Sequence, residues 1–145
     1  MLGINDCFSL NPDDPAALDG GIDWALKQAE TLLAQFRKAA PDAELGVCLT
    51  TPPNSRDAAF EAIYKGRFPR WGWRRIQHRL VEREIAQFGG REKEHLFLVP
   101  TELNLDPVGG YPDYSDVHPN AAGYQQVGAS VYAWLKARLQ ARAGP

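Results

Sequence analysis

Two short apolar runs constrain the fold of this chain most strongly. Leu45–Thr50 reads Leu-Gly-Val-Cys-Leu-Thr, and Leu96–Val99 reads Leu-Phe-Leu-Val. Turn-forming residues follow each run, Thr-Thr-Pro-Pro-Asn after the first and Pro100 after the second. A short, nearly continuous apolar run that ends at turn residues is typical of a strand buried on both faces of a sheet. We therefore expect two buried strands.

A helix is expected before the first strand. Apolar residues recur at helical spacing over Ile22–Phe36, and Pro41 closes the segment. The preceding stretch, Asn11–Gly21, is rich in proline, aspartate and glycine, which predicts a loop. Asp19 or Asp23 is then the expected N-cap of the helix, because a carboxylate there accepts hydrogen bonds from the first free backbone N–H groups.

Three further helices are expected. Arg56–Tyr64 predicts a short one, and Trp73–Phe88 predicts a longer one that stops at Gly89 and Gly90. The last is expected over Asn120–Ala141. Its apolar residues predict a buried face formed by Tyr124, Val127, Val131, Trp134 and Leu135.

Two buried strands joined by a helical crossover predict a parallel pair, and hence an α/β fold with helices on both faces of the sheet. The chain has 145 residues, of which 44% are hydrophobic, which predicts a single domain over residues 1–145. Parallel sheets place their sites at the carboxyl ends of the strands. The loops Gly3–Phe8, Thr50–Ser55 and Pro100–Asn120 are therefore expected to meet at one edge.

The last of these loops contains Asp116-Val117-His118-Pro119-Asn120. In an extended segment, residues two apart point to the same side, so Asp116 is expected to accept a hydrogen bond from His118 and fix its tautomer. The other ring nitrogen is then free to act as a general base. Taken alone, such a pair is more often a carboxylate that caps a turn with a histidine packed against it.

The chain opens with Gly-Ile-Asn-Asp at residues 3–6. A Gly-x-Asn-Asp turn normally ends a buried strand, because glycine allows the bend and the polar side chains hydrogen-bond across it. Here almost no strand precedes the turn.

Together, and in this order, Gly-Ile-Asn-Asp and Asp-Val-His-Pro-Asn-Ala-Ala-Gly-Tyr resemble the third and fourth motif blocks of the SGNH (GDSL-type) hydrolases. The fourth block is of the Asp-x-x-His type and reads Asp-Val-His-Pro-Asn here. The resemblance implies a three-layer α/β/α fold with a flavodoxin-like sheet of about five parallel strands. It also implies a serine-type hydrolase of esters, such as acyl or acetyl esters of carbohydrates, that needs no metal or other cofactor. Asn5 then corresponds to the oxyanion-hole amide, Asp116 to the orienting acid and His118 to the general base.

The serine and glycine blocks of that family belong upstream of Gly3. We therefore expect Met1 and Leu2 to be the end of an internal strand, and the chain to be the C-terminal part of a longer hydrolase domain. Its own serines are Ser9, Ser55, Ser115 and Ser130, and none lies in a Gly-Asp-Ser or Gly-x-Ser-x-Gly setting. Ser55 is the least unsuitable of the four.

The stretch Tyr64–Arg79 concentrates arginine and aromatic residues. Such side chains suit sugar rings, planar groups or anions, so we expect Arg67, Arg70 and Trp71 on the substrate side, and Tyr111 to line the site. The alternative is a purely structural role, with the arginines on a solvated face of the helix and the tryptophans packed on the core.

Composition limits the partners. The formal charge of −2 and the pI near 5.9 give no overall attraction to nucleic acid or anionic membranes. The resemblance to the SGNH hydrolases implies a small-molecule or carbohydrate ester as the ligand. Cys7 and Cys48 fit no metal or disulfide pattern and are expected to pack as free thiols.

Three alternatives stay open. The first is a noncatalytic carbohydrate-binding or interaction module. The second is a metal-dependent hydrolase that uses Asp113, Asp116 and His118. The third is a nucleic-acid binder that uses the stretch Tyr64–Arg79.

Overall fold

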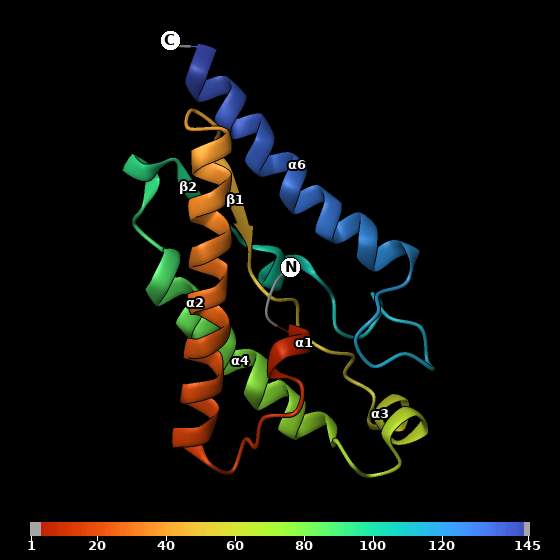
Figure 1. Cartoon of the computed structure of the whole chain (residues 1–145). Helices are drawn as coiled ribbons and strands as arrows, with labels where there is room; N and C mark the ends of the chain where they lie inside the picture. Colours follow the sequence, from red (N-terminus) through yellow and green to blue (C-terminus); the bar gives the residue numbers. More distant parts are fainter. Residues whose placement is uncertain (1–3, 144–145) are drawn as a thin grey trace. The chain divides into compact units, whose positions relative to one another are not determined.

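The computed structural model describes residues 4–143, and within this range the α/β class and the parallel strand pair are confirmed (Figure 1). The elements are α1 (Ile4–Cys7), α2 (Pro15–Ala39), β1 (Leu45–Cys48), α3 (Asp57–Tyr64), α4 (Arg70–Phe88), a 3₁₀ turn (Glu92–Glu94), β2 (Leu96–Val99), α5 (Thr101–Asn104) and α6 (Ala121–Ala143). The glycine of Gly-Ile-Asn-Asp and the strand end expected at Met1 and Leu2 lie outside the described residues.

The described chain forms two compact units. The first contains residues 4–50 and 71–98, and the second contains residues 51–70 and 99–143. The strand pair β1–β2 belongs almost entirely to the first unit, together with α1, α2 and most of α4. The second unit holds α3, α5 and α6 and the long loop between α5 and α6.

In the first unit, α2 and α4 cross beside the two strands (Figure 1). Their apolar faces meet in one core with α1 and β2, formed by Cys7, Leu18, Ile22, Ala25, Leu26, Ile76, Leu80, Phe88 and Leu96. Ion pairs join the same two helices at matching positions, Arg79 with Asp19 and Arg83 with Asp23. The core fixes the crossing, while exposed pairs of this kind contribute only about 0–1 kcal/mol each.

Helix α2 begins earlier than the sequence pattern predicts. Asp14, and not Asp19 or Asp23, is the N-cap, because its side chain accepts a hydrogen bond from the Ala17 N–H at 3.0 Å. Pro15 occupies the first helical position, where its missing N–H costs nothing. The two glycines that suggested a loop are inside the helix. Gly21 lies against the side chain of Leu10, which would have to shift if position 21 carried a Cβ.

Strand β1 ends at Cys48. Shortly after it, at Thr50, the backbone N–H and carbonyl bond to buried polar side chains and not to another strand. The Thr50 N–H and hydroxyl donate to the Glu84 carboxylate at 3.0 and 2.8 Å. The Thr50 carbonyl accepts from the Gln77 side chain at 2.8 Å. Thr50, Gln77 and Glu84 are all buried. Burial raises the pKa of the Glu84 carboxyl, and the two hydrogen bonds from Thr50 oppose that rise.

In the second unit, the predicted buried face of the C-terminal helix is wrong for three of its five residues, while Val127 and Trp134 are half-buried. Tyr124, Val131 and Leu135 on α6 are 55%, 37% and 46% exposed, whereas Gly123 and Ser130 are buried. Ser130 accepts a hydrogen bond from the Asn104 side chain at 2.7 Å. The helix therefore turns small and polar residues inward, which an apolar periodicity cannot indicate.

Among residues 4–143, no helix is both long and apolar enough to cross a membrane. Cys7 is buried, and burial raises the pKa of its thiol to about 11, so it packs as a neutral group, as expected. Cys48 is only half-buried.

Replacing Glu84 should change how stability depends on pH. Because the folded-state pKa of Glu84 is raised, its contribution to stability is fully present below the ordinary glutamate pKa and is lost as the pH rises through the raised value. Each pKa unit corresponds to about 1.4 kcal/mol. Urea unfolding of Glu84→Gln should therefore show a flatter dependence of the unfolding free energy between acidic and neutral pH. Glu82→Gln, which removes an exposed carboxylate from the same helix, should keep the wild-type slope.

Candidate functional site

The candidate site lies in the second unit, on the loop between α5 and α6. Asn54 holds this loop from the segment that precedes α3. Its side-chain amide donates to the carbonyls of Pro112 and Ser115 at 3.0 and 2.7 Å. Its backbone N–H donates to the carbonyl of Asp116 at 2.7 Å. Asn54 is fully buried, so these bonds are shielded from water and fix the loop directly beside Asp116.

Two further hydrogen bonds hold the same loop. Tyr111 is 3% exposed, and its hydroxyl donates to the carbonyl of Pro52. The Ser55 N–H donates to the carbonyl of Pro107 at 2.8 Å. Tyr111 was expected to line the site, and the structure instead gives it a bracing contact in the interior.

Asp116 and His118 differ sharply in their surroundings. Asp116 is 2% exposed, and its Oδ2 atom accepts a hydrogen bond from the Tyr64 hydroxyl. His118 is exposed, and its backbone N–H donates to the Ser115 hydroxyl at 3.2 Å. The expected hydrogen bond between the side chains of Asp116 and His118, both described, is not formed. The chain bends at Asp116 and Val117, so the alternation of an extended segment does not apply there.

Tyr64 is the site residue that sequence reasoning missed. It is the last residue of α3, and the only sequence signal was an aromatic residue at the start of the arginine-rich stretch. Burial, and then the hydrogen bond to Asp116, raise the pKa of the Tyr64 phenol, so it remains a protonated donor.

The other predicted residues are spread over both units. Asn5 is exposed in α1, a single helical turn of the first unit, and not in an open turn. In the second unit, Arg70 pairs with Asp57 at 2.6 Å, and Arg67 lies over the ring of Phe68 at 5.1 Å.

Trp71 belongs to the first unit, where it is 62% exposed. It lines a shallow hollow of about 420 Å³ together with Arg74, Arg75 and Arg79. Arg75 and Arg79 already pair with Asp13 and Asp19. The hollow therefore has little uncompensated positive charge from these two arginines.

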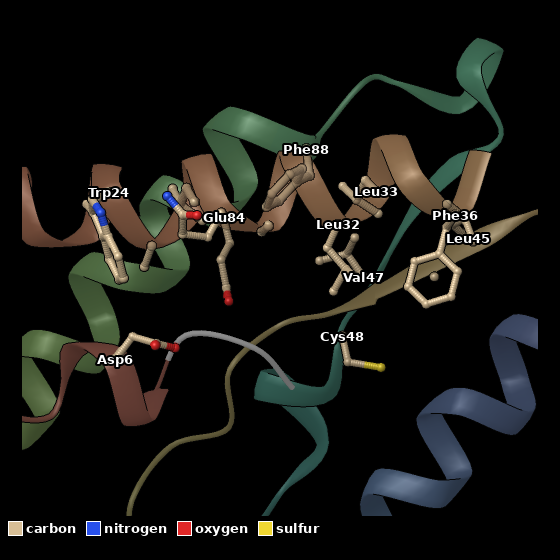
Figure 2. Close-up of a pocket in the computed structure, with 15 residues that line it drawn as sticks. Asp6, Trp24, Leu32, Leu33, Phe36, Leu45, Val47, Cys48, Glu84 and Phe88 are labelled. Atoms are coloured by element: carbon tan, nitrogen blue, oxygen red, sulfur yellow. The ribbon is translucent and has the colours of Figure 1, made fainter. Parts of the chain in front are cut away.

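A larger groove on the first unit was not predicted. It has a volume of about 490 Å³ and is mostly apolar (Figure 2). Leu45, Gly46, Val47 and Cys48 of β1 line it, as do Trp24, Ala25, Leu26, Gln28, Ala29, Leu32, Leu33 and Phe36 of α2, Asp6 of α1, and Glu84 and Phe88 of α4. Asp6 and Glu84 lie toward one end and Phe36 and Leu45 toward the other (Figure 2).

All of β1 contributes to this groove. Successive side chains of a strand point to opposite faces of the sheet, so a groove lined by every residue of the strand runs along its edge. Within the described chain β1 pairs only with β2, which leaves the backbone groups of its other edge without a strand partner.

The residues of the metal alternative do not cluster. Asp113 pairs with Arg56 at 3.3 Å, and Asp116 pairs with Tyr64. Within residues 4–143, no group of three or more histidine, cysteine, aspartate or glutamate residues is placed to hold a metal ion. Comparisons with models of protein families, with curated proteins and with solved structures found no match.

Asn54→Ala should destabilise the chain strongly. The change leaves the carbonyls of Pro112 and Ser115 without the donor that they have in a buried setting. We expect a loss of about 2–4 kcal/mol in the free energy of unfolding, measured by urea denaturation. Asn104→Ala, which removes hydrogen bonds of an exposed asparagine in the same unit, should cost about 1 kcal/mol. Equal losses would show that Asn54 is not the main anchor of the loop.

Proposed function

We propose that this chain carries the acid–base part of a serine-type ester hydrolase of the SGNH type. Its substrates are acyl or acetyl esters, with carbohydrate esters as the favoured class. The observation that supports this most is the buried carboxylate of Asp116 two residues before the exposed imidazole of His118, on one loop, in a chain whose sequence also contains Gly-Ile-Asn-Asp at residues 3–6.

In this reaction a serine hydroxyl attacks the ester carbonyl, and His118 takes its proton and later returns it to the leaving alcohol. The exposed position of His118 suits contact with a nucleophile and a substrate. Asp116 orients the imidazole when the His118 side chain turns toward it, and Asn5 donates to the oxyanion. By the resemblance, the nucleophile belongs to a motif block that precedes Gly-Ile-Asn-Asp.

The groove along β1 supports the fold-level part of this proposal. A parallel strand in the interior of an α/β sheet is paired along both edges and covered on both faces. Here one edge of β1 faces an apolar groove, rimmed by Trp24 and Phe36 at 58% and 51% exposure. A further strand beside β1 would fill the groove and extend the sheet toward the larger parallel sheet of the SGNH fold.

Two of the four serines, Ser115 and Ser130, are unsuited to act as the nucleophile, whereas Ser9 is exposed and Ser55 is half-buried. The Ser115 hydroxyl accepts a hydrogen bond from the His118 backbone, and the Ser130 hydroxyl bonds to Asn104. Both are buried, so their hydroxyls have structural partners and little access to an ester.

Removing the proposed base or acid should abolish hydrolysis. The polypeptide of the complete reading frame should cleave 4-nitrophenyl acetate and acetylated sugars, and His118→Ala or Asp116→Ala should lower kcat/KM about 10³-fold or more. His78→Ala, which removes an exposed histidine of α4, should leave kcat/KM unchanged. Turnover that survives both site substitutions would exclude the proposal. Sugar binding without turnover in the unsubstituted protein would favour a noncatalytic carbohydrate-binding module.

A strand in the groove should protect specific amides. The Leu45 N–H donates to His95 next to β2, and successive residues of a strand direct their N–H groups to opposite sides. The amides of Gly46 and Cys48 therefore face the open edge. In the polypeptide of the complete reading frame their hydrogen exchange should be at least about tenfold slower than in the 145-residue chain. The Val47 amide, which faces β2, is the internal control, and fast exchange at Gly46 and Cys48 in both proteins would contradict a continued sheet.

A further inference from the structure

Tyr64 occupies a fixed position at the end of α3. Lys65 follows in a left-handed conformation with φ of 51°, and Gly66 follows with φ of 80°, which together end the helix. The Tyr64 ring packs edge-on against Phe68 with 5.4 Å between ring centroids, and its centroid lies 6.0 Å from that of Phe60. Two aromatic neighbours therefore limit the motion of the phenol.

The phenol meets only one of the two carboxylate oxygens of Asp116. Its hydroxyl donates to Oδ2, while the Asp116 backbone carbonyl accepts from Asn54. With Oδ2 occupied and the backbone anchored, the carboxylate cannot rotate freely. The Oδ1 atom is then left to accept a hydrogen bond from an imidazole.

From this geometry we propose that Tyr64 is a positioning residue for the acid–base pair, which holds Asp116 through Oδ2 and presents Oδ1 to His118. The inference rests on the proposed hydrolase function and adds to it a residue that acts through Asp116 and does not touch the substrate. Burial of the phenol beside a carboxylate raises the Tyr64 pKa, which keeps the donor proton in place at any pH at which an ester hydrolase works.

The first test is Tyr64→Phe in the polypeptide of the complete reading frame, which keeps the ring and removes only the hydroxyl. We expect kcat for 4-nitrophenyl acetate to fall about 10- to 100-fold, the range for losing one hydrogen bond to a charged group, while KM stays unchanged. Two controls accompany it. Tyr132→Phe removes an exposed hydroxyl from α6, and Asn104→Ala removes the hydrogen bonds that the last residue of α5 makes to Pro100 and Ser130. Both should retain wild-type kcat.

A double-mutant cycle with Asp116→Asn separates positioning from general support. If Tyr64 acts through Asp116, adding Tyr64→Phe to Asp116→Asn should lower kcat no further. Losses that multiply in the double variant would overturn the proposal, as would a Tyr64→Phe enzyme with wild-type kcat.

The outcomes also separate this inference from the proposed function. Loss of turnover in Asp116→Ala and His118→Ala, with wild-type kcat in Tyr64→Phe, would reject the role of Tyr64 and keep the hydrolase. Full turnover in Asp116→Ala and His118→Ala would reject both.

Discussion

The candidate site depends on the hydrogen bonds that the buried residue Asn54 donates. One residue donates to the carbonyls of Pro112, Ser115 and Asp116 and so joins the segment before α3 to the loop before α6. Both segments lack regular secondary structure, so their backbone groups need partners of this kind. Because Asn54 is fully buried, the loop is held by bonds that water does not weaken. The position of Asp116 follows from this anchor, and the position of His118 follows from Asp116 through the bend between them.

The first unit is governed by a different constraint. A two-stranded sheet has an open edge on each strand, and isolated strand pairs are marginal in water. The core between α2 and α4 supports β1 and β2 from the side, and Glu84 and Gln77 hold the chain after β1 at Thr50. The edge of β1 is still lined by an apolar groove. Contiguous apolar surfaces of this kind often mark places where another segment or partner binds, and the proposed additional strand would cover this one.

Sequence reasoning predicted the elements that rest on local patterns. Both strands, α3 and α4 were found because continuous apolar runs and helical periodicity reflect burial directly. The start of α2 was wrong because the prolines, aspartates and glycines of Asn11–Gly21 were taken as a loop, whereas Asp14 caps the helix, Pro15 occupies its first position and both glycines lie inside it. The burial of α6 was wrong because its contacts use Gly123 and Ser130, residues that carry no apolar signal.

The candidate site was predicted less completely for a related reason. Asp116 and His118 were recognised by residue type and spacing, but their pairing depended on an extended backbone that the bend at Asp116 and Val117 replaces. Tyr64 and Asn54 lie 52 or more positions from their partners in the loop. Contacts that distant leave no periodic trace in a single sequence, so only the folded chain brings them together.

The hydrogen bonds of Tyr64 and Tyr111 in the second unit differ in the kind of acceptor that they use. The Tyr111 hydroxyl donates to the carbonyl of Pro52, and this neutral contact holds the loop without burying a charge. Tyr64 donates instead to a carboxylate that is 2% exposed. Removing a carboxylate from water costs several kcal/mol unless partners offset it, so a loop that needed only support would be more stable with a neutral acceptor. An orienting acid must be a carboxylate, held by a fixed donor and placed beside a histidine that solvent and substrate can reach. Asp116 is a buried carboxylate held by the Tyr64 hydroxyl, and His118, two residues further on, is exposed, which is the arrangement that the proposed hydrolase needs.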